Sequence, residues 1–176
     1  MVDQLTKEDL HNQIQAVEAM LTDAQNDMRV LLLHLRPTEL ENKTLQEGLQ
    51  MILKELTDKS NIRVIYKDMV KKVPKRIENN LFRIAQEFIS NTLKHAKASQ
   101  IEVYLYQNSQ EIQLKMLDNG VGYDLNASTD EMSYGLKNIQ ERVDEMAGTV
   151  QFLSAKGKGT SIDVRVPILR GENNVE

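Results

Sequence analysis

The feature that most restricts the fold is a heptad pattern in the first 36 residues. Apolar side chains recur there in alternating steps of four and three residues. They are Leu10, Ile14, Val17, Leu21, Ala24, Met28, Leu31 and Leu35. This spacing is typical of a coiled coil or a helical bundle. Because a chain of 176 residues has no room for a second helix of similar length, we expect self-association. The alternative is a long helix folded back on its own domain.

Helix and strand signals follow in a regular order. Pro37 disfavours helical geometry at Arg36, which predicts a first segment over 1–36 and a linker over 37–43. Thr44 and Glu47 have the spacing of a capping box and begin a second helix of about four turns. Alternating apolar residues at 62–66 predict a short strand.

A third helix, after Pro74, has two distinct faces. The apolar face contains Ile77, Leu81, Ile84, Ala85, Phe88 and Thr92. The polar side contains Asn80, Glu87, Asn91, Lys94 and His95. These polar residues gather because positions three, four and seven apart share a helix face. A solvated surface would explain them as well as a binding site does.

Residues 101–106 and 112–117 alternate with a period of two and predict a hairpin. Asp118-Asn119-Gly120-Val121-Gly122 follows directly. Its glycines permit positive φ and a close approach of the backbone to a flat ligand, and its carboxylate accepts hydrogen bonds. A nucleotide pocket and a plain turn are both compatible with this stretch taken alone.

The last third of the chain predicts a polar loop, a helix and two strands. Residues 123–133 lack periodicity and suggest a mobile loop. A helix should begin at Gly135, where its free amides could bind phosphate, and end with Gly148 as its C-cap. Strands at 149–153 and 160–166 flank a glycine-rich bend, and 171–176 should be a frayed tail.

Composition excludes several classes of function. The net charge of −4, with scattered basic residues, argues against a nucleic-acid partner. The three histidines lack the paired spacing of a zinc site. The absence of cysteine suits a reducing cytoplasm, and no apolar run approaches the length of a membrane span. Neither the P-loop nor the Rossmann glycine motif is present.

The order of the motifs carries a resemblance. The chain resembles the ATP-binding domain of sensor histidine kinases in the order of its motifs. These are a helix with Glu87 and Asn91, then Asp118-x-Gly-x-Gly, a polar loop, Gly135-Leu136 and a Gly-x-Gly-Thr ending at Thr160. Their superfamily, known as GHKL, also contains gyrase, Hsp90 and MutL. Four further stretches are similar to the LiaS/VraS group: LLLHLRP at 31–37, LFRIAQE at 81–87, SN at 90–91 and YGLKNI at 134–139.

This resemblance implies an α+β fold: a two-layer α/β sandwich over 44–170, preceded by the heptad helix. Residues 1–36 would be the second helix of a dimerisation and phosphoacceptor bundle. The phosphorylated histidine of that group is followed by Asp and lies well upstream of the Leu-Arg-Pro element. His11 is followed by Asn12, and His34 belongs to that element itself. We therefore expect a fragment that lacks the acceptor and binds ATP without autophosphorylation.

The resemblance also implies roles for individual residues. Asp118 would accept a hydrogen bond from the adenine amine, with Thr160 sharing a water and with Gly120 and Gly122 beneath the ring. Asn91 would bind Mg²⁺, and Glu87 would be the general base or would organise the water on the metal. Lys94, His95 and the amides of Gly135 and Leu136 would face the phosphates.

For the parent protein, the resemblance implies a homodimer in the bacterial cell membrane with a cytoplasmic catalytic domain. It would transfer phosphoryl from ATP to histidine and then to a response regulator, in envelope-stress signalling. Two alternatives stay open. One is an anti-sigma-factor-type serine kinase of the same superfamily. The other is a non-catalytic, nucleotide-gated dimerisation module.

Overall fold

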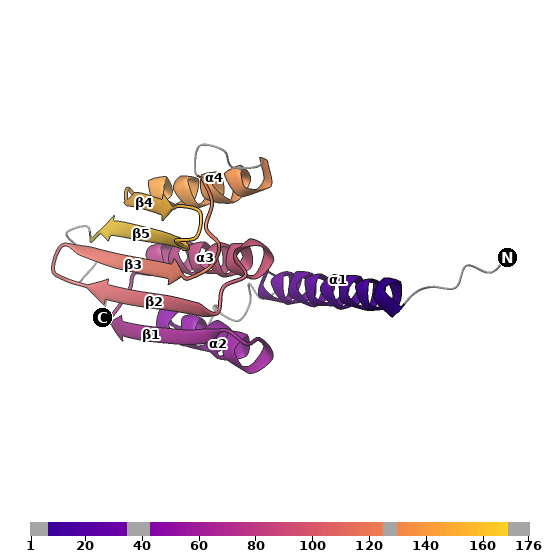
Figure 1. The fold of residues 1–176 in the computed structure, drawn as a ribbon. Helices are drawn as coiled ribbons and strands as arrows, with labels where there is room; N and C mark the ends of the chain where they lie inside the picture. Colours follow the sequence, from indigo (N-terminus) through magenta and orange to yellow (C-terminus); the bar gives the residue numbers. More distant parts are fainter. Residues whose placement is uncertain (1–6, 35–42, 125–129, 169–176) are drawn as a thin grey trace.

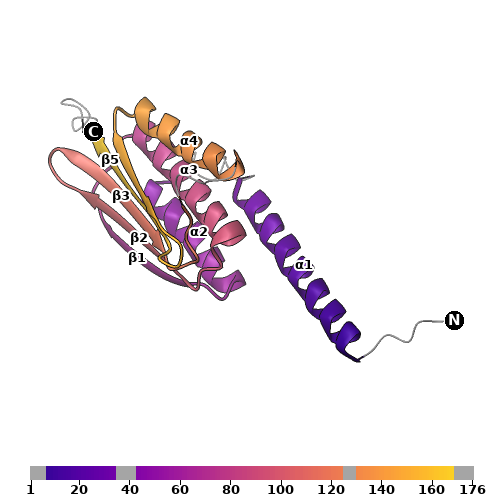
Figure 2. The same cartoon turned by 45° about the horizontal axis from the view of Figure 1, so that its top comes forward.

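The computed structural model describes residues 7–34, 43–124 and 130–168. Within these residues, five strands form one sheet in the order β1-β2-β3-β5-β4. Helices α2, α3 and α4 cover one face of this sheet, while α1 extends away from it (Figures 1 and 2). The expected two-layer sandwich with a long N-terminal helix is therefore confirmed. The linker after residue 36 and the C-terminal tail lie almost entirely outside the described residues.

The elements follow the chain in the expected order. Their bounds are α1 Lys7–His34, α2 Leu45–Lys59, β1 Arg63–Met69, α3 Lys75–Asn91, the π-helix η2 Thr92–Ala96, β2 Gln100–Gln107, β3 Glu111–Asp118, α4 Asp130–Glu145, β4 Thr149–Ser154 and β5 Thr160–Pro167. β1 and β2 are parallel, connected through α3 and η2, and the other neighbouring strands are antiparallel.

The start of α2 is held by the predicted capping box. The Thr44 hydroxyl accepts from the Glu47 amide at 3.3 Å, and the Glu47 carboxylate accepts from the Thr44 amide at 2.7 Å. The Leu45 amide donates to the buried carboxylate of Glu78 on α3 at 3.2 Å. Because these bonds satisfy donors that the first helical turn leaves free, they fix the register of α2 against α3.

The core lies between the sheet and the three helices. On β2 and β3, alternate side chains are fully buried, including Val103, Leu105 and Leu114. Since strand residues alternate between the two faces, the intervening polar residues lie on the open face. The apolar face of α3 packs on the buried side, as its spacing predicts. At the end of β3, this alternation directs Asp118 toward the helices.

The heptad positions of α1 whose side chains the structure describes are exposed. Leu10, Ile14, Val17 and Leu21 have 49–59% of their surface accessible, although α1 contacts η2 and α3. The described part of the helix is therefore not folded back on the sandwich. Self-association through this seam stays a prediction.

Two expectations about α4 are wrong. The helix begins at Asp130, so the predicted loop is shorter and Gly135 lies in the second helical turn. Only the first four amides of a helix lack an intrahelical acceptor, so Gly135 and Leu136 are not at the helix N-terminus as expected, and their role in phosphate binding stays a prediction. At the other end, Ala147 rather than Gly148 adopts the left-handed conformation, with φ of 55°. The Gly148 amide donates to the Val143 carbonyl at 3.0 Å, completing a Schellman motif around Ala147.

Candidate functional site

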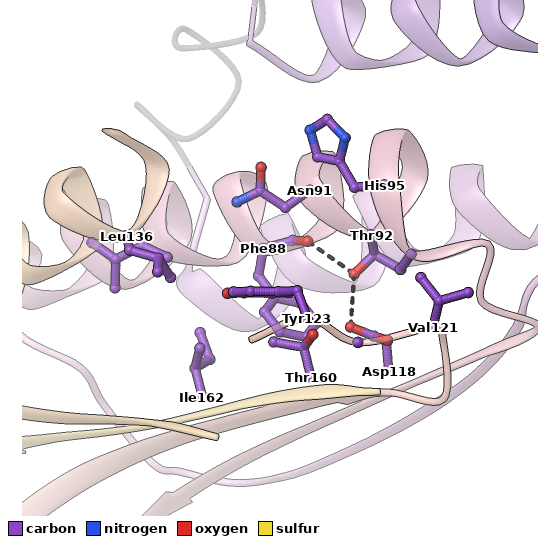
Figure 3. Close-up of a pocket in the computed structure, with 13 residues that line it drawn as sticks. Phe88, Asn91, Thr92, His95, Asp118, Val121, Tyr123, Leu136, Thr160 and Ile162 are labelled. Atoms are coloured by element: carbon purple, nitrogen blue, oxygen red, sulfur yellow. Dashed lines mark hydrogen bonds between the residues drawn. The ribbon is translucent and has the colours of Figure 1, made fainter. Parts of the chain in front are cut away.

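A cavity of about 240 Å³ lies between the ends of β3 and β5 and the helices α3, η2 and α4 (Figure 3). Six of the residues singled out in the sequence line it: Asn91, His95, Asp118, Gly122, Leu136 and Thr160. Apolar side chains, including Phe88, Ile139 and Ile162, form much of the remaining wall. A mostly apolar cavity with a few convergent polar groups is the usual form of a small-molecule site.

Asp118 is the buried charge of this cavity, with 8% of its surface accessible. Its Oδ1 accepts from the Gly120 amide at 2.8 Å, and its Oδ2 lies 3.5 Å from the Thr92 hydroxyl. Burial raises the pKa of Asp118 above its usual value, while hydrogen bonds from Gly120 and Thr160 oppose that rise. The carboxylate therefore accepts hydrogen bonds from Gly120, Thr92 and Thr160, and it lines the cavity.

The two glycines after Asp118 serve close packing. A Cβ at Gly120 would overlap the carbonyl of Ala96, which accepts a hydrogen bond from the Val121 amide at 2.8 Å. Gly122 has φ of 58°, and a Cβ there would overlap the Ala155 carbonyl. Gly122 lines the cavity and Gly120 does not. The motif thus holds the turn against η2 and the β4–β5 bend, in addition to giving the backbone room at the cavity.

Glu87 and Asn91 lie one turn apart on α3. The Asn91 amide nitrogen donates to Glu87 Oε1 at 3.4 Å, which leaves Asn91 Oδ1 pointing away from Glu87. A Cβ on Gly135 would come within 2.6 Å of Glu87 Oε1 and 3.1 Å of the Asn91 amide nitrogen. Gly135 is therefore the point where α4 approaches this pair closely. Asn91 lines the cavity, whereas Glu87 and Gly135 lie just outside it.

Lys94 and His95 separate because the helix changes type. Both are exposed, and His95 lines the cavity while Lys94 does not. Both belong to η2, where the backbone follows i→i+5 hydrogen bonding. The α-helical spacing that places Lys94 beside Asn91 therefore does not apply there.

Sequence reasoning missed two polar groups that line the cavity, Thr92 and Tyr123, and one that lies beside it, Ser154. Thr92 was placed on the apolar face of its helix, yet its hydroxyl lies beside Asp118. Tyr123 lies across the cavity in Figure 3, and burial together with the charge of Asp118 raises its pKa. Ser154 accepts from the Tyr123 amide at 3.0 Å and lies 3.1 Å from the Thr160 hydroxyl. A hydroxyl within an otherwise apolar helix face was the available signal for Thr92.

The residues present fit an adenine nucleotide with Mg²⁺. A buried acceptor in an apolar cavity suits an aromatic base that carries an amine, and the amide oxygen of Asn91 is a ligand type that Mg²⁺ accepts. Among the residues that the structure describes, no cluster of three or more His, Cys, Asp or Glu side chains could hold a metal. Magnesium commonly takes few protein ligands and binds through the phosphates of its substrate.

Comparison with known proteins identifies the class. Residues 76–170 match the family described as "Histidine kinase-, DNA gyrase B-, and HSP90-like ATPase". This match covers more than half of the chain and includes each of the residues that line the cavity. The chain therefore belongs to this family of ATPases.

Within the family, the chain is similar to particular sensor kinases. It is 43% identical over 163 residues to the sensor histidine kinase LiaS of Bacillus subtilis, covering 91% of this chain and 45% of the relative. It is 40% identical over 170 residues to the sensor protein VraS of Staphylococcus saprophyticus, covering 97% of this chain and 49% of the relative. The chain thus spans about half the length of these curated relatives.

Solved structures agree on the fold. The histidine kinase domain of the blue-light activated kinase EL346 from Erythrobacter litoralis matches with a TM-score of 0.60 at 15% identity, covering 97% of this chain and 88% of that one. The ATP-binding domain of PrrB from Mycobacterium tuberculosis matches with a TM-score of 0.58 at 15% identity, covering 71% and 94%. In the described residues, none of the helices is long and apolar enough to cross a membrane.

Proposed function

We propose that this chain is the ATP-binding catalytic part of a sensor histidine kinase of the LiaS/VraS type. The observation that carries the proposal is Asp118, a buried carboxylate at the end of β3 that lines a mostly apolar cavity. Membership of the ATPase family and the identity with LiaS and VraS support it.

Adenine recognition is assigned to the strand end. Asp118 Oδ2 accepts from the exocyclic amine of the base, which distinguishes adenine from guanine because guanine presents a carbonyl at the same ring position. Thr160 pairs with Asp118 across β3 and β5 and shares a water with the base. Gly122 and the apolar wall leave room for a flat ring.

Phosphate and metal binding are assigned to α3 and η2. Asn91 binds Mg²⁺ through Oδ1, because its amide nitrogen is turned toward Glu87. Glu87 acts as general base or orients a water on the metal, since its carboxylate accepts a hydrogen bond from the Asn91 amide nitrogen. His95, which is exposed and lines the cavity, faces the phosphates, and the exposed Lys94 beside it extends toward them from outside the cavity. The bound metal supplies neutralisation of the phosphate charge that develops during transfer.

The reaction is transfer of the γ-phosphoryl group to a histidine nitrogen, with ADP as the leaving group, and then to an aspartate of a response regulator. Positioning and charge neutralisation supply most of the catalysis in such transfers. The acceptor is neither His11 nor His34, so this chain binds ATP without autophosphorylation. In the parent, the exposed seam of α1 pairs within a homodimeric bundle, and a membrane sensor detects envelope stress.

Calorimetry with ATP, ADP and GTP, each with and without Mg²⁺, tests the site. We expect binding of both adenine nucleotides, tighter ATP binding with Mg²⁺, and much weaker binding of GTP. Absence of ATP binding at millimolar concentration would favour the non-catalytic module instead. Incubation with radiolabelled ATP tests the proposal that this chain does not autophosphorylate. Acid-labile phosphate on His11 or His34 would show that the acceptor assignment is wrong.

A further inference from the structure

Thr92 lies between the cavity and a second groove, which runs beside α1. It is the first residue of η2, and only 3% of its surface is accessible. Its side chain lines the nucleotide cavity, and the same residue borders a polar groove between α1 and the turn from α2 to β1. A buried hydroxyl at this position has to find a hydrogen-bond partner within the protein.

Two acceptors compete for the single hydroxyl proton of Thr92. The Phe88 carbonyl lies 3.0 Å from Thr92 Oγ1, and Asp118 Oδ2 lies 3.5 Å away (Figure 3). The Phe88 carbonyl already accepts from the backbone amide of Thr92. The proton can therefore move to the carboxylate without leaving that carbonyl unsatisfied.

The other groups around Asp118 show what the contact between the Thr92 hydroxyl and Oδ2 contributes. Oδ1 accepts from the Gly120 amide and Oδ2 lies beside the Thr92 hydroxyl, while the backbone amide and the hydroxyl of Thr160 also donate to this carboxylate. The titratable side chains that share the cavity are His95 on η2 and Tyr123 after β3, and Lys158 borders the adjoining groove at the β4–β5 bend. The cavity-lining residues Leu136 and Ile139 of α4 carry no charge. The side chains that hydrogen-bond to Asp118 are the hydroxyls of Thr92 and Thr160, and the Thr92 hydroxyl lies 3.5 Å from Oδ2.

We propose that Thr92 is a positioning residue for the base-binding carboxylate. Its hydroxyl donates to Asp118 Oδ2, holds that oxygen toward the cavity and favours its charged form, so that the site presents an ionised acceptor to the amine of an adenine nucleotide. The part of this inference that concerns the nucleotide rests on the proposed function. The contact between hydroxyl and carboxylate does not.

The test compares Thr92→Val, which keeps the shape and removes the hydroxyl, with Thr92→Ser, which keeps the hydroxyl. Thr57→Val is the matched control, because the Thr57 hydroxyl makes the same bond to the carbonyl four residues earlier, at 3.0 Å, on α2. Thr92→Ala repeats the loss of the hydroxyl with a smaller side chain in case valine does not pack. The pKa of Asp118 is measured by carbon-13 NMR without ligand, and ATP affinity is measured by calorimetry across pH.

Removal of a donor from a carboxylate disfavours the charged form, so Thr92→Val should raise the pKa of Asp118. The acidic limb of the ATP-affinity profile should move to higher pH, and affinity at neutral pH should fall about fivefold, the weight of one hydrogen bond. Thr92→Ser and Thr57→Val should keep both values near those of the unmodified chain.

The outcomes separate the two proposals. If the unmodified chain does not bind ATP, the proposed function is wrong, whatever Thr92 does. If it binds ATP and Thr92→Val leaves the pKa of Asp118 unchanged, the positioning role is wrong, even where affinity falls. Equal behaviour of Thr92→Ser and Thr92→Val would also overturn it, because only one of the two lacks the hydroxyl.

Discussion

Replacement of Asp118 by asparagine isolates the acceptor at the centre of the site. The side-chain amide oxygen of asparagine can keep the bond from the Gly120 amide, which now spans 2.8 Å to Oδ1. The amide nitrogen then takes the place of Oδ2, opposite Thr92 and toward the cavity. A donor would thus face the donor of the base, and a charge-assisted hydrogen bond would be lost.

The magnitude follows from that loss. A hydrogen bond to a charged group contributes about 1.5–3 kcal/mol, so ATP affinity should fall between about 10-fold and about 100-fold. Calorimetry on the unmodified and Asp118→Asn chains measures this directly, with the Mg²⁺ concentration held constant. An unchanged affinity in a folded variant would refute the assignment of Asp118 to the base.

The same substitution should not weaken the fold. Burial raises the pKa of Asp118 above 3.8, so the folded chain binds this proton more tightly than the unfolded chain does. Ionised Asp118 therefore costs folding free energy at neutral pH, and that cost disappears as the pH falls through its folded-state pKa. Asp118→Asn should unfold at an equal or higher temperature at neutral pH, and the difference should shrink in acid. Thermal unfolding followed by circular dichroism across pH checks the sign.

Four further predictions address the turn, the helix end, the metal and the seam. Gly122→Ala should destabilise the fold by about 2 kcal/mol or more in chemical denaturation, because φ is positive and the added Cβ would overlap a carbonyl. Ala147→Gly should stabilise it by about 0.5–1 kcal/mol, seen as a higher unfolding midpoint, because it relieves a left-handed alanine. Asn91→Ala should abolish the gain in ATP affinity from Mg²⁺ while metal-free binding persists in the same titration; an undiminished gain would exclude Asn91 as the ligand. Leu21→Glu should reduce any self-association seen by light scattering, since Leu21 is 59% exposed on the heptad seam.

Local patterns in the sequence predicted most of the elements. The capping box at Thr44, the hairpin before Asp118 and the two final strands all depend on contacts between residues close in the chain. The family also emerged from the sequence, because it depends on the order of motifs rather than on their geometry. Asp118 could be placed at a cavity because it ends a strand whose buried face was evident from alternation.

Tertiary structure decided which of the singled-out residues meet. Asn91, His95, Asp118, Gly122, Leu136 and Thr160 line one cavity, while Glu87, Lys94, Gly120 and Gly135 lie outside it. The difference arises from non-local packing, in which α4 approaches α3 at Gly135 and the turn at Gly120 approaches η2. The π-helix was not predicted from the sequence, and Lys94, which belongs to it, does not line the cavity.

The sequence by itself therefore determined the family, the order of the elements and the chemical groups available to a nucleotide. It could not determine the partner of Thr92, because that partner lies 26 residues later, on a strand that reaches it only in the folded chain. Local hydrogen bonding and side-chain periodicity set the first kind of information. Which side chains meet depends on how helix and sheet pack. That packing places the hydroxyl of Thr92 beside the carboxylate of Asp118, and no spacing pattern in the sequence indicates it.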